Sequence, residues 1–279
     1  MELKNVGKVV SRAWELSQDK LLELRSQAHL LMPGVLGMPI RGPLVQFYRN
    51  DETFETHVSL VNYMSYFSPD ESVTQNYSLT TYDPNGRRLG SENLPLLQGQ
   101  ALQENLASIM GGRVAEYGVF SVNTTYSPRY RGGIRFLGET SPQFMTLYIP
   151  KDQRSGPQMV HSHKRFEAWP VPTGASSRPS GCVEDLNQVS RLDIFVLNSG
   201  PAGVSGRILF GSIDSKDTLL TLPFEIRGHG VSRLTLSEKE LKRFPGPASI
   251  RIEHNRLIQH RKPILFRTSK TGFVSCNHL

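Results

Sequence analysis

The chain has 279 residues, 38% of them hydrophobic and 20% charged, and it carries a formal net charge of +7. This length supports one or two domains with a core in each, and the composition excludes a disordered chain. Two cysteines are too few for a disulfide framework, and no apolar run is long enough to cross a bilayer. The basic balance favours an anionic partner only weakly, because the basic residues are spread along the chain.

Residues 1–43 are predicted to form an N-terminal helix followed by a linker arm. From residue 2 to residue 31 the apolar side chains recur at helical spacing, and Met32-Pro33-Gly34 ends the pattern. We expect the apolar side of this helix to pack on its own sandwich or on a neighbouring subunit. A membrane-surface helix is the alternative, which four acidic residues oppose: Glu2, Glu15, Asp19 and Glu23. The N-terminus lacks the uninterrupted apolar run of a signal peptide, so the expected location is the cytoplasm.

One unit occurs twice, in residues 44–165 and 191–279. Each copy has an apolar opening strand, a strand that runs into a polar turn, a proline-bearing apolar stretch and two closing strands. The matched segments are 57–63 with 192–198, 76–86 with 206–217, 93–97 with 221–225, 118–123 with 249–254, 144–149 with 263–267 and 159–163 with 273–278. So many matches in the same order predict a tandem duplication.

Strand signals dominate both copies. Residues 44–48 are predicted as a first strand, and Asp83-Pro84-Asn85-Gly86 is a strong turn, because proline presets its dihedral while Asn and Gly accept positive φ. Residues 101–110 and 234–241 are predicted as matching short helices that plug one end of each sandwich. Residues 166–190, which are rich in Pro, Gly and Ser, are predicted to link the units.

The predicted fold is therefore mainly β. It consists of two tandem antiparallel β-sandwich units, related by internal duplication and preceded by a helical segment. Short strands at close spacing with Gly/Pro turns indicate antiparallel sandwiches rather than a parallel sheet with crossover helices.

The second unit resembles a known family in residues 192–267. The segment Ile194-Phe195-Val196-Leu197-Asn198-Ser199-Gly200 is followed by a strand, an acidic turn, a Pro-Phe strand and Pro263-Ile264-Leu265. This pattern is similar to the β-sandwich of the sensory rhodopsin transducer proteins, which are small cytoplasmic adapters that self-associate. The resemblance implies a sandwich fold and favours an adapter-type function, and it carries over no functional residue.

Motifs of common enzyme classes are missing from the sequence. Gly111-Gly112 and Gly132-Gly133 lack the lysine of a phosphate-binding loop, and Gly203-Val204-Ser205-Gly206 is one residue out of register for a nucleophile elbow. No catalytic residue is nominated. This lowers the odds of an enzyme without excluding one.

The two matched tails contain the residues of a candidate metal site. His161 and His163 are two residues apart, so their side chains face the same way on an extended segment, and Cys276 and His278 repeat that spacing. If a pseudo-twofold axis relates the units, these four ligands converge in a set suited to tetrahedral zinc. The alternative is two polar strand ends without a metal.

Basic residues in corresponding loops of the two units form a candidate anion or nucleic-acid site. Its members are Arg129, Arg131, Arg256, Arg261 and Lys262, with Tyr130 between the first two. Arginine beside an exposed aromatic ring suits phosphate contact and base stacking. The alternative is a solvated hairpin face.

Together these features favour a non-catalytic binding or assembly protein of adapter type, oligomeric and cytoplasmic. We expect its partner to be another protein or a second copy, with the N-terminal helix as the self-association surface. The first alternative is a metal-binding protein or an enzyme that uses the His/Cys site. The second is a nucleic-acid-binding protein that uses the basic loops, for which affinity would fall steeply with salt.

Overall fold

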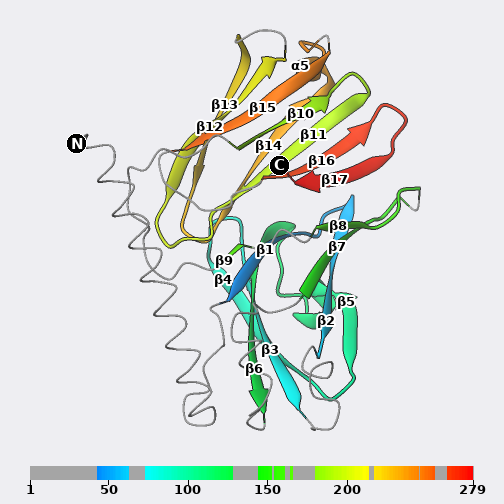
Figure 1. Ribbon diagram of the computed structural model, residues 1–279, viewed down its shortest axis with the longest axis vertical. Coiled ribbons are helices and arrows are strands. Elements are labelled where there is room, and N and C mark those ends of the chain that lie inside the picture. Colours follow the sequence, from blue (N-terminus) through cyan, green and yellow to red (C-terminus); the bar gives the residue numbers. More distant parts are fainter. Residues whose placement is uncertain are drawn as a thin grey trace, which may run out of the picture.

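The chain folds into antiparallel β-sheets, as a computed structural model shows (Figure 1). The structure describes residues 43–62, 73–127, 144–152, 154–160, 164–165, 180–213, 217–244, 246–254 and 263–278. The helix predicted within residues 2–31 lies outside these ranges. Neither of the two helices in the described ranges is long and apolar enough to cross a membrane.

The first unit is a sandwich of two sheets. Its elements are β1 (Leu44–Arg49), β2 (Phe54–Val61), β3 (Thr74–Tyr82), β4 (Arg88–Leu96), β5 (Ala101–Asn105), α3 (Leu106–Ile109), β6 (Tyr117–Ser127), β7 (Phe144–Pro150), β8 (Gln158–Val160) and β9 (Lys164–Arg165). One sheet has five strands in the order β4-β3-β6-β1-β9, and the other has four in the order β5-β2-β7-β8.

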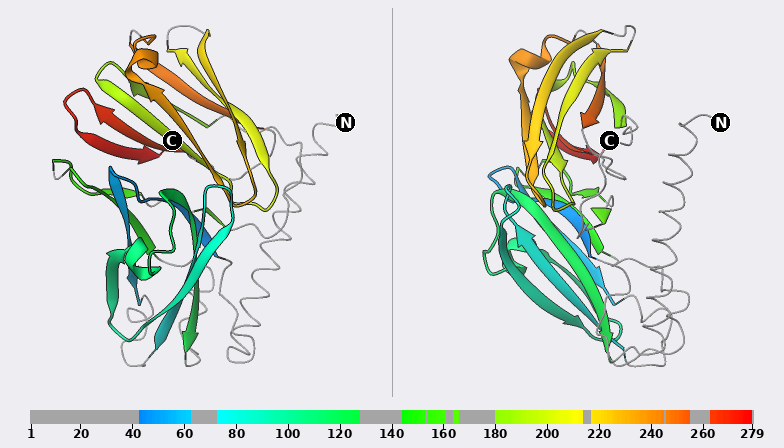
Figure 2. Two further views of the ribbon diagram at one scale, coloured as in Figure 1. Left: turned by 180° about the vertical axis from the view of Figure 1, so that it is seen from behind. Right: turned by 90° about the vertical axis from the view of Figure 1, so that its left-hand side faces the viewer.

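The second unit is a sandwich of two four-stranded sheets, ordered β10-β15-β12-β13 and β14-β11-β16-β17. Its elements are β10 (Ser180–Asp185), β11 (Val189–Leu197), β12 (Val204–Ser212), β13 (Thr218–Ile226), β14 (Val231–Ser237), α5 (Glu238–Leu241), β15 (Pro247–His254), β16 (Ile264–Ser269) and β17 (Val274–His278). Figure 2 shows the two units stacked along the long axis of the molecule.

The two units have the same topology. Apart from β9, the order β4-β3-β6-β1 corresponds to β13-β12-β15-β10, and β5-β2-β7-β8 corresponds to β14-β11-β16-β17. The segments matched in the sequence fall on these corresponding strands. The prediction of two antiparallel sandwich units with a repeated order of elements is therefore confirmed for the described residues.

A buried asparagine ties the same loops together in both units. Asn62 donates from Nδ2 to the carbonyl oxygens of Val73 and Leu96, at 2.7 and 2.9 Å. Asn198 makes the matching pair of bonds, at 2.8 and 2.9 Å, to the loop after β11 and to the turn between β13 and β14. The repeat thus extends to individual side chains.

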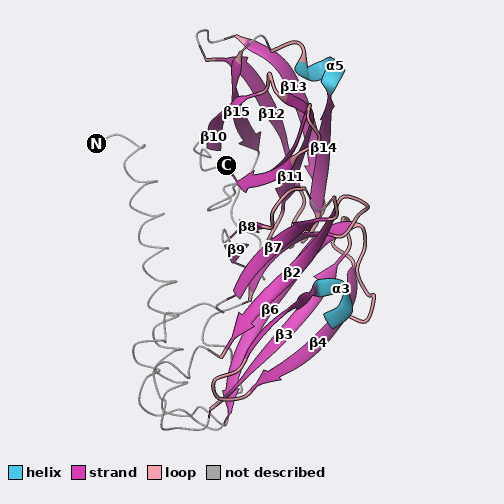
Figure 3. Cartoon of the chain, turned by 90° about the vertical axis from the view of Figure 1, so that its right-hand side faces the viewer, coloured by secondary structure: helices cyan, strands magenta, loops and turns pink. Residues whose placement is uncertain are grey.

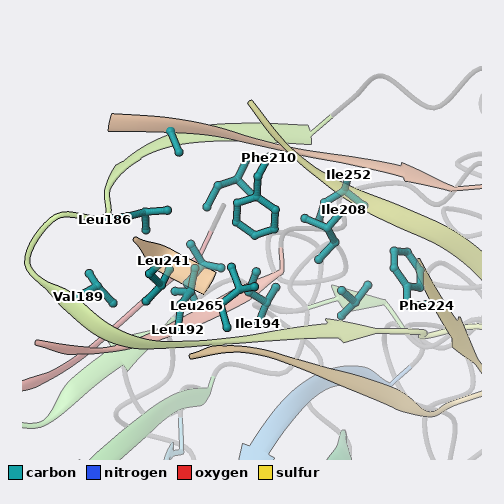
Figure 4. Packing of buried hydrophobic residues seen from close by; sticks show 14 of the residues in the cluster. Leu186, Val189, Leu192, Ile194, Ile208, Phe210, Phe224, Leu241, Ile252 and Leu265 are labelled. Atoms are coloured by element: carbon teal, nitrogen blue, oxygen red, sulfur yellow. The ribbon is translucent and has the colours of Figure 1, made fainter. Parts of the chain in front are cut away.

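Each sandwich has its own core, formed because alternate residues along each strand face inward. In β2 the buried and partly exposed residues alternate from Phe54 to Val61. Figure 4 shows the core of the second unit, where Leu192 and Ile194 of β11 pack opposite Ile208 and Phe210 of β12.

The short helices predicted over residues 101–110 and 234–241 are present only in the second part of each segment. Within residues 101–110, the first five form β5 and only Leu106–Ile109 is helical; within residues 234–241, only Glu238–Leu241 is helical. Each helix begins at a capping residue, Asn105 or Ser237, that ends the preceding strand. Leu106 and Leu241 lie in the two cores, and Figure 3 shows α5 at the end of the second unit away from the first.

The linker predicted over residues 166–190 is wrong in its second half. Residues 180–185 form β10, which pairs along its whole length with β15, and β11 begins at Val189. The sequence of β10 is polar because it is an edge strand. An edge strand is held mainly by backbone hydrogen bonds to one neighbour and needs few core side chains.

Candidate binding site at the junction of the two sandwiches

A third hydrophobic core joins the two units. The first unit contributes Val45, Phe47, Phe54, Val119, Tyr148 and Val160, and the second contributes Phe195, Leu197, Val231, Ile264, Phe266 and Val274. All of these side chains are at most 7% exposed. An interface buried to this degree resembles a domain core, so the two sandwiches form one body.

Strand β11 belongs to two cores at once. Its residues Leu192, Ile194 and Val196 face the core of the second unit, while Phe195 and Leu197 face the first unit. A strand buried on both faces reads as a continuous apolar run, which is the pattern of residues 194–197. The apolar run 194–197, which the sequence predicts as an ordinary sandwich strand, therefore also lies at the centre of the junction.

Aromatic rings fill the middle of the junction. The rings of Phe47 and Phe195 have centroids 4.3 Å apart, and those of Phe54 and Phe266 are 4.8 Å apart in an edge-on arrangement. Tyr148 packs edge-on against Phe266 and donates a 2.8 Å hydrogen bond from its hydroxyl to the carbonyl of Phe47. Such pairs add about 0.5–1.5 kcal/mol each beyond the area they bury.

Arg49 crosses from the first unit into this aromatic layer. Its side chain is 3% exposed, and its guanidinium carbon lies 4.8 Å from the ring centroids of both Phe54 and Phe266. Nε is 2.6 Å from Oδ2 of Asp51, and Nη2 is 3.3 Å from Oδ2 of Asp193 in the second unit. Burial lowers the pKa of Arg49 from its ordinary 12.5, and Asp51 is the main opposing influence.

The carboxylate of Asp193 is the central acceptor of this network of charged side chains. Thr235 Oγ1 donates to it at 2.6 Å, Arg233 Nη2 lies 3.2 Å away and Arg191 Nε lies 3.3 Å away. Burial by itself would raise the pKa of Asp193, but the bonds from Thr235 and Arg233 and the charge of Arg49 outweigh it and lower that pKa from 3.8. The carboxylate is therefore ionised and joins three arginines across the junction.

The turn between β3 and β4 forms a second connection between the units. The carbonyl of Pro84 accepts a 2.9 Å hydrogen bond from the backbone N–H of Val231. Gly86, at φ +79°, lies so close to Gly228 that a Cβ on Gly86 would stand 1.9 Å from the Gly228 carbonyl oxygen. Only glycine fits this approach of two backbones, so the turn predicted from the sequence also fixes the second unit.

An open pocket of about 710 Å³ lies beside this turn. Both units line it, with Pro84, Asn85 and Tyr117 from the first and Gly203, Val204, Ser205, Glu225, Ile226, Arg227, Val231, Ser232 and Arg233 from the second. Its side chains combine two guanidinium groups, one carboxylate, hydroxyls and one aromatic wall. This set suits ion pairing and hydrogen bonding to a polar ligand.

Most of the site residues predicted from the sequence lie outside the described ranges. These are His161, His163, Arg129, Arg131, Arg256, Arg261 and Lys262. Cys276 and the backbone of His278 lie in β17, and β17 runs beside β8 across the junction (Figures 1 and 2). The described part of the first tail, Met159 and Val160 in β8, thus lies beside the second tail. Among the described residues, no group of three His, Cys, Asp or Glu side chains could hold a metal ion, and the zinc hypothesis stays a prediction.

Cys276 is packed against the junction core rather than presented to solvent as a ligand. It lies opposite Phe266 in the β16–β17 pairing and beside the cluster that contains Val160. Burial raises the pKa of its thiol far above the ordinary value, so the sulfur is protonated at neutral pH. Zinc binds the thiolate, and this environment opposes its formation.

The residues of the junction were not predicted as a site from the sequence. Asp193 is the one that left a signal, because it is a charged residue inside the apolar run 192–197. A charge in such a run is seldom buried unless it is paired. Nothing in the local sequence marks Arg49 as its partner.

No family model matches the chain, and no curated protein matches it. Among solved structures, it is similar to a β-glucuronidase from glycoside hydrolase family 2, with 9% sequence identity and a TM-score of 0.22. The match covers 85% of this chain and 24% of that one, so the chain spans about a quarter of the length of that enzyme. A similarity this low carries no argument about function. The resemblance to the sensory rhodopsin transducer proteins stays a prediction.

Proposed function

We propose that the chain is a non-catalytic binding protein of adapter type that holds an acidic segment of a protein partner in the pocket at the junction. A cytoplasmic location, as expected from the sequence, is part of this proposal. The observation that carries it is that both sandwiches line one open pocket while the junction holds them as a single body. A preorganised site of this kind spends little free energy on ordering when a partner binds.

The charges in the pocket select the class of partner. Arg227 is exposed, and Arg233 lies with its guanidinium carbon 5.9 Å from the ring centroid of Tyr117. A guanidinium has five N–H donors, and the bonds from Arg233 to Asp193 use two of them. Glu225 adds an acceptor at the rim. A carboxylate with a neighbouring N–H donor, as in an acidic peptide, matches this arrangement.

Fluorescence anisotropy tests the proposal with a labelled polyglutamate peptide. Arg227→Glu should weaken its binding at least about tenfold, which corresponds to about 1.4 kcal/mol. Lys239→Glu is the matched control, because it makes the same charge change on α5 at the far end of the second unit (Figure 3). Equal affinities of the two variants would contradict the proposal.

Two further probes separate the alternatives. A neutral polyglutamine peptide of the same length should bind much more weakly than polyglutamate. A single-stranded oligonucleotide could instead bind more tightly than polyglutamate, with an affinity that Arg227→Glu leaves unchanged and that falls steeply with salt. That result would support the alternative function, nucleic-acid binding through the basic loops.

A further inference from the structure

Seven large apolar side chains of the described residues are exposed, and five of them lie at positions that the repeat relates to the junction. These five are Leu97, Met145, Met159, Val183 and Ile213, at 55%, 51%, 55%, 58% and 48%. The first three belong to the first unit and the other two to the second. In the repeat, these side chains stand at or beside positions whose counterparts in the other unit form the junction.

Met145 and Met159 lie on the outer face of the sheet β5-β2-β7-β8. In β7 the residues Phe144, Thr146 and Tyr148 are buried and the alternate ones point outward. The outward apolar residues of the sheet, here called the sheet-B face, are Val61, Ala101, Met145, Leu147, Ile149 and Met159. Met159 lies opposite Leu147, so the face is continuous across β7 and β8.

The corresponding face of the second unit is the one that the first unit covers. Leu147 is paired with His57 on one side and Met159 on the other, just as Phe266 is paired with Asp193 and Cys276. The repeat therefore places Leu147 at the position of Phe266. By the same register, Met145 stands where Ile264 stands and Val61 where Leu197 stands. The sheet-B face is thus the counterpart of a face that is buried in the second unit.

Val183 and Ile213 lie on the surface of the second unit that corresponds, in the repeat, to the surface with which the first unit covers the second. In the first unit, Val119 is paired with Phe47 on one side and with Tyr82 on the other. In the second unit, Ser249 is paired with Val183 and with Gly211.

Val183 therefore stands at the position of Phe47, which is buried in the junction. Ile213 follows Gly211 by two residues, as Pro84 follows Tyr82, so it stands at the position of the turn that docks on the second unit. Leu97 lies in the β4–β5 turn, the counterpart of the β13–β14 turn that receives Pro84.

We infer that copies of the chain associate head to tail. The sheet-B face and Leu97 of one copy cover the surface around Val183 and Ile213 on the second unit of the next copy, and so repeat the contact that joins the two units within one chain. Two different surfaces meet in this contact, so it extends into a ring or a filament rather than closing as a twofold dimer. It uses none of the pocket residues and stands independently of the proposed function.

Size-exclusion chromatography with light scattering on the full chain tests this inference. The wild type should show a mass that rises with concentration above that of the monomer. Met145→Glu with Met159→Glu should remove this rise, and so should Val183→Glu with Ile213→Glu. Phe273→Glu is the matched control, because Phe273 is 54% exposed in the β16–β17 turn and belongs to neither surface.

A mixture of the two double variants gives the sharpest result. Each variant keeps the surface that the other has lost, so the mixture should form one-to-one dimers and nothing larger. A twofold contact between two sheet-B faces would instead leave the Val183→Glu, Ile213→Glu variant dimeric, and that outcome overturns the inference.

Two other outcomes also overturn it. One is a wild-type chain that stays monomeric up to its solubility limit. The other is assembly that both double variants retain but that deletion of residues 1–42 abolishes, which would assign self-association to the helix predicted from the sequence in that segment. Circular dichroism of each variant confirms that a loss of assembly is not a loss of folding.

Discussion

The guanidinium of Arg49 in the first unit and the carboxylate of Asp193 in the second lie 3.3 Å apart, and their side chains are 3% and 4% exposed. A buried ion pair is weak evidence of net stability, because the loss of hydration offsets much of the attraction. Its strict geometry nevertheless favours one docking of the two sandwiches over others. If either partner is removed, the other remains as an uncompensated charge in an aromatic core.

The first prediction follows from the difference between the small net effect of the intact ion pair and the large cost of leaving one charge unpaired. Asp193→Ala should lower the free energy of unfolding by about 3–5 kcal/mol, the usual cost of breaking a buried pair from one side. Urea unfolding followed by fluorescence measures it. Glu52→Ala, an exposed carboxylate in the loop between β1 and β2, is the control and should change stability by less than about 0.5 kcal/mol. A loss for Asp193→Ala as small as that of the control would show that the pair does not fix the junction.

The second prediction concerns acid. The pKa of Asp193 is lowered in the folded chain from its ordinary 3.8, so its ionised form stabilises the fold above that pH. The stability that this group contributes is lost as pH falls below its unfolded pKa and through the folded one. The difference in unfolding free energy between the wild type and Asp193→Asn should therefore be constant near neutral pH and shrink below pH 3.8. A difference that grew in acid would mean that the carboxyl is protonated in the folded chain.

The third prediction tests the docking of the β3–β4 turn. Gly86 and Gly99 both have positive φ, +79° and +73°, but a Cβ on Gly99 would meet no atom within 4 Å. Gly99→Ala should cost about 1–2 kcal/mol from backbone strain alone. Gly86→Ala should cost clearly more, because its Cβ meets the backbone of Gly228 in the other unit. Urea unfolding of the two variants gives the comparison, and equal costs would show that the turn can shift away from the second unit freely.

The fold was predictable because the two units repeat a pattern of short-range signals. The strand at residues 44–48 and the turn at residues 83–86 were predicted from local signals, and both are present in the structure. The order of the matched segments is present as well. The short helices were predicted correctly only in the second part of each segment, since propensity alone does not show where Asn105 ends a strand and caps a helix. Strand β10 was missed because an edge strand carries little apolar signal.

The junction could not be predicted in the same way. Arg49 and Asp193 are far apart in the chain, and their meeting depends on how two finished sandwiches pack. Phe195 lies in a segment that was predicted only as an apolar strand, and its ring faces outward into the other unit. Burial on both faces of a strand cannot be told from a run of apolar residues. The metal site was predicted from spacing in the two matched tails and the anion site from basic residues in matching loops, and most of those residues lie outside the described ranges.

The fourth prediction concerns Tyr48, whose hydroxyl donates to the carbonyl of Tyr82 and accepts from the N–H of Ala115, both at 3.0 Å. Tyr48→Phe should cost about 1–3 kcal/mol at neutral pH, because it leaves these backbone groups without that partner. Burial raises the pKa of Tyr48 from 10.0 to about 12, so its stabilising effect is complete below pH 10 and lost as pH rises towards 12. The penalty of Tyr48→Phe, measured by urea unfolding, should therefore shrink above pH 10. A penalty that is unchanged at pH 11 would contradict the buried assignment of this hydroxyl.

The last prediction decides the zinc hypothesis through Cys276. Its thiol lies against the junction core, and burial favours the protonated form, whereas a metal binds the thiolate. We therefore expect a Cys182→Ser chain, titrated with cobalt(II) at neutral pH, to show no thiolate-to-cobalt absorption. The thiol should also react with a disulfide reagent far more slowly in the folded chain than in urea. If the cobalt band appears and Cys276→Ser removes it, the free energy of metal binding has overcome the cost of burying the thiolate. That result would restore the site predicted at His161, His163, Cys276 and His278, because β17 already lies beside β8, the described part of the first tail.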